Sequence, residues 1–520
     1  MGELIAPLAA AAGGELALAD DFGETNWDAF DQRVNRLIHA FRGAGVEAGD
    51  SIAILSGNRR EYYETMAAGS QAGWRYVPIN WHWVPEEVAY VLANSDARAL
   101  VVEARYADVA AQALAGPGAP RPRIVVVVGG PAPPPFIDYE EVLAGSSPDE
   151  PDAQCLGGPM FYTSGTTGRP KGVVSSSLPV GVPLAAMKLV GAAVAGSLGL
   201  PSGGRTFLDG PLYHSAQWAF SFLPLLAGSA VVMRHKFDAE ETLTVIDQYR
   251  ITNLHLVPTQ FIRLLRVDAG TRDRFDGSSL QAVWHGAAPC SPQVKRQMIE
   301  WWGPVIHEYY GATEGGIVTT IRAGEWLEHP GSLGRLQDNM EARVIREDGE
   351  VAGPGEEGQL YFRSKTGADF EYHKDPEKTA AAHLEPGVFT FGDVGYLDHE
   401  GFLFMSDRKI DMIISGGVNI YPAEIEGVLV AHPAVADAAV FGIPNEEFGE
   451  EVKAAVELCD GFEAGSTLAE ELAAHCRGHL AGYKVPRSVD FETTLPRHPT
   501  GKLYKRLLRE PYWKGQERRI

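Results

Sequence analysis

The segment from Tyr162 to Val173, Y-T-S-G-T-T-G-R-P-K-G-V, has the composition of a phosphate-binding loop. It holds three glycines, four serine or threonine residues and two cations in twelve positions. Glycines let backbone amides converge on phosphate oxygens, hydroxyl groups add donors or reach a magnesium ion, and Arg169 and Lys171 supply positive charge. The spacing departs from G-x-x-x-x-G-K-[ST], because Lys171 follows Gly168 by three residues. We therefore expect a phosphate site of a type other than the P-loop.

A second group of polar residues, Y-G-A-T-E at 310 to 314, follows the β-like run from Val305 to Tyr309. We expect Gly311 to form a tight turn there, so that Thr313 and Glu314 point into a cleft at the end of a strand. A carboxylate in that place suits magnesium, a hard cation that prefers oxygen ligands. The pattern favours a nucleotide site.

Alternating strands and helices must position these residues. Short β-rich runs alternate with amphipathic stretches, which indicates an α/β fold. The expected elements are strand Ile52–Leu55, helix Glu61–Gln71, strand Tyr76–Ile79, helix Pro85–Asn94, strands Leu100–Val102 and Arg123–Val128, and then strand Ala230–Met233, helix Glu240–Tyr249, strands Asn253–Val257 and Gln281–Trp284, and a helix capped by Ser291.

Shorter elements follow Asp407, and we place a domain boundary there. They are helix Pro422–Ala431, strands Ala436–Phe441 and Glu451–Leu458, and helix Leu468–Leu480. The sequence thus predicts a large domain over residues 1–407, built of α/β subdomains with mostly parallel sheets flanked by helices plus a β-rich part. A small α+β domain is expected over 408–520.

Composition excludes several classes of protein. The 520 residues carry 68 acidic and 45 basic side chains, a formal charge of -23, which disfavours a nucleic-acid partner. The 4 cysteines contain no C-x-x-C pair, as is typical of a reducing compartment. No basic segment precedes the apolar start and no apolar run approaches the length that crosses a bilayer. We expect a cytoplasmic protein, monomeric or homodimeric, without a transmembrane segment.

The phosphate loop resembles, nearly residue for residue, the signature of the adenylate-forming superfamily, which includes acyl-CoA synthetases, peptide-synthetase adenylation domains and beetle luciferases. Further motifs of that superfamily follow in its order. They are P-L-Y-H at 211 to 214, H-G-A-A-P at 285 to 289, Y-G-A-T-E at 310 to 314, G-D at 392 to 393, D-R-K-I-D-M-I-I-S-G-G-V-N-I-Y-P-A-E-I-E at 407 to 426, and P-T-G-K at 499 to 502. The resemblance spans nearly the whole chain.

The resemblance implies a binding site for ATP and Mg2+. Thr313 is expected at the α-phosphate, Thr163 and Glu314 at the magnesium ion, and Asp393 at the ribose hydroxyls, with Arg408 as a candidate second partner. The other positions implied to contact nucleotide are Ser164, Gly165, Thr166, Thr167, Gly168 and Lys171 in the phosphate loop, Gly286, Ala287 and Ala288 beside adenine, and Tyr310 and Gly311 on the stacking side.

The ribose motif departs from the commoner W-x-x-T-G-D form, with Val388 and Phe391 in place of Trp and Thr. Such variants resemble a subgroup that acts on fatty, bile and steroid acids, so fatty acid metabolism is one expected setting. Asp393 itself is unaffected.

Lys502 is the residue that the resemblance assigns to adenylation, as a cation bridging the substrate carboxylate and the α-phosphate. Lys409 falls at the hinge about which the small domain pivots. Ser415, Gly416 and Gly417 would then enter the site and leave room for a pantetheine arm.

The acyl pocket has the least specific sequence signal of the whole site. His214 matches an aromatic position of the superfamily at this pocket, where it is expected to orient the carboxylate or gate the thiol route. Gln217, Trp218 and Phe220 could line the pocket, as could Gly315, Gly316 and Ile317, which predicts an apolar acid.

The expected reaction has two steps. A carboxylate attacks ATP to give an acyl-adenylate and pyrophosphate, and coenzyme A then displaces AMP. Transfer to an amine, making an amide ligase, or to a carrier-protein thiol remains open. A non-catalytic nucleotide-binding relative is disfavoured, because Glu314, Asp393 and Lys502 are all present.

Overall fold

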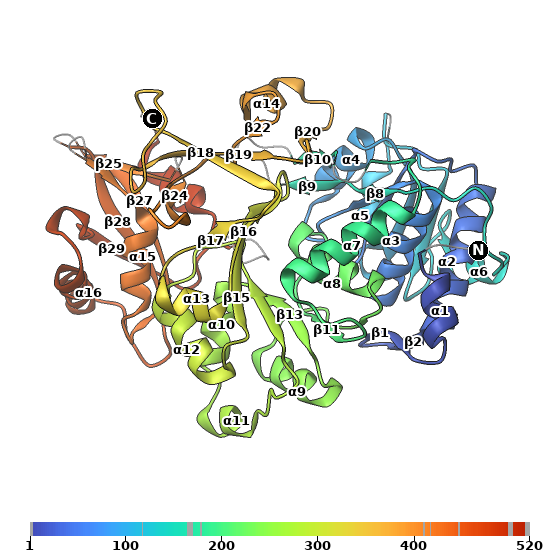
Figure 1. The fold of residues 1–520 in the computed structure, drawn as a ribbon, viewed down its shortest axis with the longest axis horizontal. Helices are drawn as coiled ribbons and strands as arrows, with labels where there is room; N and C mark the ends of the chain where they lie inside the picture. The colour runs from blue at the N-terminus through green and yellow to red at the C-terminus, as the bar shows by residue number, and fades with distance from the viewer. Residues whose placement is uncertain are drawn as a thin grey trace.

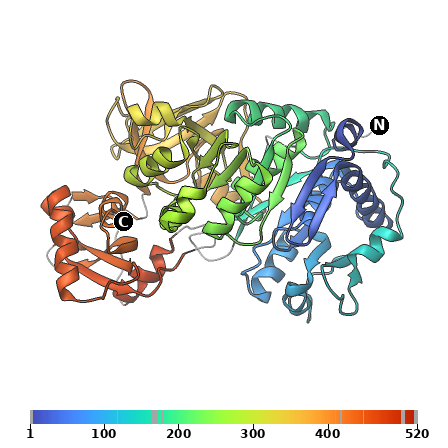
Figure 2. The same cartoon turned by 90° about the horizontal axis from the view of Figure 1, so that it is seen from below.

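The computed structural model describes residues 4–116, 118–163, 170–176, 179–408, 411–415, 418–445, 448–497 and 503–514. Strands within these ranges form sheets of 15, 6, 5 and 3 strands. Figures 1 and 2 show the N-terminal part in blue at one end of the molecule, the green and yellow central part in the middle, and the orange and red C-terminal part at the other end.

The N-terminal part is built on the 6-stranded sheet, in the order β7-β6-β5-β3-β4-β8, and its neighbouring strands are parallel. Its strands are β3 (Ser51–Leu55), β4 (Arg75–Pro78), β5 (Ala97–Glu103), β6 (Ile124–Val128), β7 (Ile137–Asp138) and β8 (Gly158–Pro159). Its helices are α1 (Ala6–Ala12), α2 (Trp27–Gly43), α3 (Arg60–Ala72), α4 (Pro85–Asn94), α5 (Ala107–Ala113) and α6 (Tyr139–Ala144), with the 3-10 turn η1 (Ala104–Tyr106).

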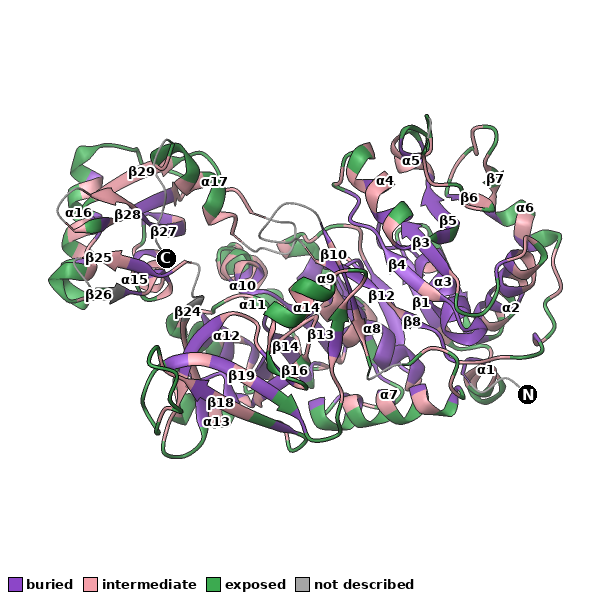
Figure 3. Cartoon of the chain, turned by 90° about the horizontal axis from the view of Figure 1, so that it is seen from above, coloured by how far each residue is buried: buried purple, intermediate pink, exposed green. Residues whose placement is uncertain are grey.

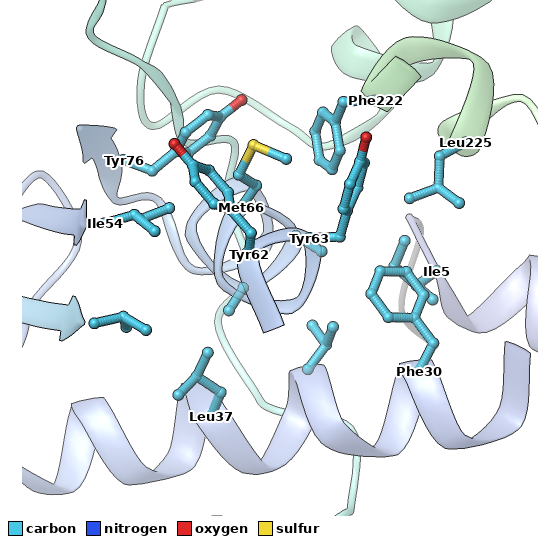
Figure 4. Close-up of a cluster of buried hydrophobic side chains, with 14 of the residues drawn as sticks. Ile5, Phe30, Leu37, Ile54, Tyr62, Tyr63, Met66, Tyr76, Phe222 and Leu225 are labelled. Carbon is cyan, nitrogen blue, oxygen red and sulfur yellow. The ribbon is translucent and has the colours of Figure 1, made fainter. Parts of the chain in front are cut away.

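Helix α3 forms the centre of the largest core. Its Tyr62, Tyr63 and Met66 are almost completely buried. Figure 4 shows these side chains between α2, which contributes Phe30 and Leu37, and other elements of the core. Apolar residues recur every three or four positions along α2, so one face of that helix is buried against α3.

The central part is one continuous 15-stranded sheet. Strands β1, β12, β11, β13, β14 and β15 pair in parallel, and the sheet continues through antiparallel strands from β16 onward. The parallel strands are β1 (Leu16–Asp20), β11 (Arg205–Leu208), β12 (Ala230–Met233), β13 (Asn253–Leu256), β14 (Ala282–His285) and β15 (Ile306–Ala312), with β2 (Gly23–Asn26) antiparallel at the edge. The antiparallel strands are β16 (Gly316–Ile321), β17 (Gly334–Leu336), β18 (Met340–Ile345), β19 (Gly358–Ser364), β21 (His383–Glu385), β22 (Val388–Phe389), β23 (Asp393–Leu397) and β24 (Phe402–Arg408).

Helices accompany this sheet, and a small antiparallel sheet joins the N-terminal and central parts. The helices are α7 (Ala185–Leu198), α8 (Ser215–Leu226), α9 (Ala239–Tyr249), α10 (Pro258–Leu265), α11 (Ala269–Arg274), α12 (Pro292–Trp302), α13 (Ala323–Glu328) and α14 (Pro376–Ala381). The small sheet contains β9 (Phe161–Thr163), β10 (Lys171–Ser175) and β20 (Phe370–Tyr372). Figure 3 shows buried residues gathered on the strands and exposed residues on the outer faces of the helices.

The C-terminal part has its own five-stranded sheet and core. Its strands are β25 (Ile413–Ser415), β26 (Val418–Ile420), β27 (Val435–Asn445), β28 (Gly449–Leu458) and β29 (Ser488–Glu492). Its helices are α15 (Pro422–Val430), α16 (Ser466–His479) and α17 (Lys505–Arg509), with the 3-10 turns η2 (Gly482–Lys484) and η3 (Glu510–Tyr512). The predicted boundary after residue 407 falls at the end of β24, the last strand of the central sheet along the chain.

The predicted α/β architecture is confirmed, and two local predictions need correction. Gly311 was expected in a tight turn, but it lies within β15, where the register shifts after Tyr310. A Cβ atom at Gly311 would lie 2.0 Å from the carbonyl oxygen of Gly316, so the close approach of two strands requires glycine there. Ser291 occupies the N-cap position of α12, but its side chain makes no capping hydrogen bond.

No helix in the described ranges is both long enough and apolar enough to cross a lipid bilayer.

Candidate active site

A cavity of about 2230 Å3 lies where the N-terminal, central and C-terminal parts meet. Its walls include residues of β9, β10, α7, α8, β13 and β15, together with C-terminal residues. The sequence-predicted residues that it brings together are Thr163, Lys171, His214, Gln217, Trp218, Gly311, Ala287, Thr313, Glu314, Gly315, Gly316 and Ile317.

Other predicted residues lie away from the wall or outside the described ranges. Among the described residues, Gly286, Ala288 and Tyr310 are adjacent in sequence to lining residues, and Asp393 follows the lining residue Phe391 by two positions. Ser415 lies at the end of β25 and is not part of the lining. Arg408 is the last residue of β24, and its backbone pairs in register with that of Asp393. The predicted residues outside the described ranges are Ser164, Gly165, Thr166, Thr167, Gly168, Lys409, Gly416, Gly417 and Lys502.

Strands β9 and β10 bring the two ends of the phosphate-loop segment together. They pair antiparallel, with Thr163 opposite Lys171. Both residues line the cavity. The strand pair therefore places a hydroxyl and an ammonium group on the same side of the cavity, at the two ends of the glycine-rich segment.

Glu314 is held by a tyrosine that the sequence did not single out. The hydroxyl of Tyr372, at the end of β20, donates a 3.0 Å hydrogen bond to Oε1 of Glu314. The ammonium group of Lys171 lies 4.9 Å from the centre of the Tyr372 ring. Burial lowers the pKa of Lys171, with Lys378 adding to the shift, while Asp375 and Glu314 oppose it. Tyr372 thus contacts both the ammonium group of Lys171 and the carboxylate of Glu314.

The N-terminus of α8 meets the turn that carries Thr313. Ser215, the first residue of α8, lies with Oγ 2.7 Å from Oγ1 of Thr313. The first turn of α8 also lines the cavity. Because the leading N–H groups of a helix carry partial positive charge, this end of α8 favours an anion such as a carboxylate or phosphate.

The residues predicted to contact the nucleotide lie on β15 and directly after β14. Ala287, two residues after β14, has φ +67°, a left-handed conformation that is uncommon for residues other than glycine. Its neighbour Gly286 packs on Tyr309, since a Cβ atom there would lie 2.7 Å from the tyrosine ring. The hydroxyl of Tyr310 donates a 2.6 Å hydrogen bond to Oδ2 of the buried Asp393. This bond holds the carboxylate of Asp393, the residue predicted to bind the ribose, next to Tyr310, the predicted stacking residue.

Gln217, which is predicted to line the acyl pocket, belongs to a chain of polar groups that lies among aromatic rings. Nε2 of Gln217 lies 3.0 Å from Nδ1 of His255, and Nε2 of His255 lies 3.0 Å from the hydroxyl of Tyr309. Burial lowers the pKa of His255 to about 3, so the ring is neutral at physiological pH. Trp218 borders the pocket and the core, and its Nε1 donates to the hydroxyl of Tyr76 at 2.9 Å. His255 and Tyr309 were not predicted from the sequence.

A buried ion pair lies between β15 and α12. Nζ of Lys295 is 2.6 Å from Oε2 of Glu308, and both residues are buried. Burial raises the pKa of Glu308 and lowers that of Lys295, while the attraction between the two charges opposes both shifts. Glu308 precedes Tyr310 by two residues on β15, so the pair supports the strand that carries the predicted stacking residue.

The C-terminal part contributes to the cavity wall near the segment 498–502. Arg497 and Tyr504, which flank the segment 498–502, both line it. Arg266, just after α10, donates from Nη2 to the carbonyl oxygens of Val435 and Ala436 at 3.1 and 3.0 Å. Arg266 thus holds β27 against the central part.

The structure adds Ser215, His255, Tyr309 and Tyr372 to the predicted site. A sequence signal was present for Ser215 alone, because it lies within the P-L-Y-H-S run. The other three are single aromatic or histidine residues at strand positions, with no diagnostic spacing.

Comparison with known proteins agrees with this geometry. A profile described as "AMP-binding enzyme" matches residues 8–369, and one described as "AMP-binding enzyme C-terminal domain" matches residues 424–502. The chain is similar to a feruloyl-CoA synthase from Amycolatopsis sp, with 35% identity over 91% of this chain and 91% of the relative. It is also similar to 3-oxocholest-4-en-26-oate--CoA ligase from Rhodococcus rhodochrous, with 34% identity over 94% of this chain and 91% of the relative.

The fold is shared with a solved enzyme. The amide bond synthetase McbA from Marinactinospora thermotolerans superposes with a TM-score of 0.82 at 28% identity, covering 98% of this chain and 99% of that chain. Sequence profile, curated relatives and fold agree over nearly the full length, and the chain therefore belongs to the AMP-binding enzyme family.

Proposed function

We propose that this cavity activates a carboxylic acid with ATP to give an acyl-adenylate and then transfers the acyl group to coenzyme A. The enzyme is an AMP-forming acid-thiol ligase. The observation that carries the proposal is the contact between Ser215 and Thr313. It brings the N-terminus of α8, where we propose that the carboxylate lies, next to Thr313, which we propose for the α-phosphate.

The first step is an in-line displacement. A carboxylate oxygen attacks the α-phosphorus, a P–O bond forms, and the bond to pyrophosphate breaks. The strand pair that holds Thr163 and Lys171 would bind the departing phosphates, and Thr313 would hold the α-phosphate. The N-terminus of α8 offers partial positive charge near the approaching carboxylate. Lys502, from the flanked segment 498–502, would neutralise the charge that grows between the two anions.

The residues present fit a magnesium ion. Thr163 and Glu314 offer oxygen ligands on the phosphate side, and the bond from Tyr372 orients the Glu314 carboxylate. In the described part of the chain there is no cluster of three or more His, Cys, Asp or Glu side chains that could hold a metal by itself. When bound, Mg2+ neutralises phosphate charge during the displacement.

The nucleoside would lie along β14 and β15. Asp393, oriented by Tyr310, would accept hydrogen bonds from both ribose hydroxyls, with Arg408 beside it in the strand pair. Gly286, Ala287 and Ala288 would leave space for the flat adenine base. A carboxylate held by a tyrosine suits a diol, because it can accept two hydrogen bonds at once.

The second step requires the C-terminal part to present a different edge. The thiol of coenzyme A attacks the acyl carbon, a C–S bond forms, and AMP leaves with the former carboxylate oxygen. In the present arrangement Arg497 and Tyr504 line the cavity, whereas Ser415 does not. This supports the assignment of the present arrangement to the first step. We propose rotation about Lys409, bringing Ser415, Gly416 and Gly417 to the site.

The acid has an apolar body. Phe220, Ile317 and Val194 line the acyl side of the cavity, and the curated relatives are named for feruloyl and cholestenoate substrates. His214, at the N-cap of α8, would lie beside the carboxylate.

An amine acceptor is the second candidate, since the chain shares its fold with an amide bond synthetase. One experiment separates the two acceptors. The protein is incubated with ATP, Mg2+ and a panel of aromatic, steroid and fatty acids, with coenzyme A and amines present together, and products are identified by mass. Acyl-CoA with AMP and pyrophosphate is expected. Formation of amide without thioester would overturn the assignment of coenzyme A as the acceptor. Absence of pyrophosphate release with every acid would overturn the proposed acid activation.

A further inference from the structure

The chain Gln217–His255–Tyr309 is the polar feature on the acyl wall that the two-step reaction leaves unused. Its members come from α8, β13 and β15, and all three line the cavity. Their exposed fractions are only 5%, 3% and 6%. The two contacts of 3.0 Å make it one continuous hydrogen-bonded unit.

The direction of the hydrogen bonds follows from the donors available. The amide nitrogen of Gln217 can only donate, so Nδ1 of His255 accepts in the assigned orientation. The ring hydrogen is then on Nε2 and is donated to the hydroxyl oxygen of Tyr309. The O–H group of Tyr309 has no second hydrogen-bond partner within the described part of the chain. Its hydrogen is therefore available to a ligand.

The surroundings hold this hydroxyl in place. The ring of Phe220 lies 4.9 Å from His255 and 5.0 Å from Tyr309, measured between ring centres. Gly286 packs against the edge of the Tyr309 ring. Burial keeps His255 neutral, so the chain brings a directed hydrogen-bond donor but no charge into an aromatic wall. A buried donor without an acceptor destabilises a fold unless a ligand uses it.

The chain is displaced along α8 and β15 from the place proposed for the carboxylate. Gln217 follows His214 by three residues on α8, a rise of about 4.5 Å. Tyr309 precedes Thr313 by four residues, and Thr313 directly follows the end of β15, so the two are at most about 13 Å apart along the chain. A ligand atom that reaches Tyr309 is thus roughly 5 to 13 Å from the carboxylate, the length of a short aromatic or alkyl acid.

We propose that the acyl pocket selects carboxylic acids that carry an oxygen acceptor, as hydroxyl, ether or carbonyl, at the end remote from the carboxylate. Tyr309 donates to that oxygen, and Gln217 and His255 set the direction of its O–H bond. Tyr309 is therefore a specificity-determining residue, and the inference rests on the proposed acid activation at the same site.

Matched acid pairs test this inference. Each pair differs only in a remote oxygen: 4-hydroxycinnamate and 4-methylcinnamate, 5-hydroxyindole-3-acetate and 5-methylindole-3-acetate, and 8-hydroxyoctanoate and nonanoate. The kcat/KM for pyrophosphate release is measured for each acid. In every pair that supports turnover, the oxygen-bearing acid is expected to be preferred at least 10-fold.

The variant Tyr309→Phe removes the donor and keeps the ring. It is expected to reduce kcat/KM for the oxygen-bearing acid about 10-fold and to leave the apolar acid within about 2-fold, so the preference disappears. Tyr63→Phe is the matched control, because Tyr63 is also a buried tyrosine and loses a 2.7 Å hydrogen bond to Ser221, yet it lies away from the cavity lining. Its preference should equal that of the wild type.

Two results would overturn the inference while the proposed function stands: equal or reversed preference in the wild type, or a preference that survives Tyr309→Phe. Absence of pyrophosphate with every acid would instead count against the proposed function, and the inference would fail with it.

Discussion

The hydroxyl of Tyr372 donates a 3.0 Å hydrogen bond to Oε1 of Glu314, although 58 positions separate the two residues in the chain. Burial, and then the charge of Glu314, raise the pKa of Tyr372. The hydroxyl therefore keeps its proton and remains a donor at physiological pH. This bond orients the carboxylate that we assign to magnesium.

The variant Tyr372→Phe tests that assignment. Loss of a residue that orients a metal ligand typically weakens metal affinity about 10- to 100-fold. We expect the Mg2+ concentration for half-maximal pyrophosphate release to rise about 10-fold. Tyr361→Phe is the control, because Tyr361 lies on β19 away from the cavity lining. An unchanged Mg2+ titration for Tyr372→Phe would remove Glu314 from the metal site.

Lys502 is expected to act in one step only. Lys502→Ala should reduce pyrophosphate release at least 100-fold, because an uncompensated approach of two anions loses several kcal/mol of stabilisation. Thioester formation from supplied acyl-adenylate should remain within about 3-fold of the wild type. Arg506→Ala, which changes an exposed cation in α17, should leave both steps intact. Equal loss in both steps would contradict the assigned role.

Arg266 is expected to stabilise the arrangement that serves the first step. Its two hydrogen bonds to β27 carbonyls join the central and C-terminal parts. Arg266→Ala should slow pyrophosphate release about 3- to 10-fold, consistent with the loss of charge-assisted hydrogen bonds at a partly exposed contact. Conversion of supplied acyl-adenylate to thioester should not slow. Arg274→Ala, at the end of α11, provides the control, and parallel slowing of both steps by Arg266→Ala would exclude selective stabilisation.

Asp209 predicts a pH dependence of stability. Burial raises its pKa to about 7, above the value of 3.8 for a free carboxyl, while hydrogen bonds from Gln260 and Thr242 oppose the shift. Because the folded-state pKa is raised, its contribution to stability is full below about pH 4 and is lost as pH rises toward 7. Asp209→Asn should therefore gain stability relative to the wild type between pH 5 and pH 8, by roughly 2 to 3 kcal/mol.

Denaturant unfolding at several pH values measures this difference. A difference in unfolding free energy between Asp209→Asn and the wild type that is independent of pH would show that Asp209 stays charged in the folded protein.

Much of the fold could be predicted because its local patterns agree with its packing. Helix α4 has the predicted bounds Pro85–Asn94, and β12 has the predicted bounds Ala230–Met233. Helix α2 was not predicted, although Phe30, Val34 and Leu37 recur with helical spacing, so the signal was present in the sequence.

The site was predicted where a residue belongs to a contiguous motif. Thr313 and Glu314 line the cavity, as expected from their position after a strand. Tyr372 and His255 could not be predicted, because their roles depend on contacts made only when distant strands meet. Gly311 was misassigned to a turn for the same reason, since the carbonyl of Gly316 that requires a glycine there lies on the next strand.

The acyl-adenylate itself can be tested by following one oxygen atom. The enzyme is incubated with an acid labelled with 18O in both carboxylate positions, together with unlabelled ATP, Mg2+ and coenzyme A. The mass of the AMP produced is then measured by mass spectrometry. Attack of the carboxylate on the α-phosphorus transfers one labelled oxygen, so AMP heavier by one 18O is expected in every turnover. Unlabelled AMP, or ADP and phosphate in its place, would contradict adenylate formation.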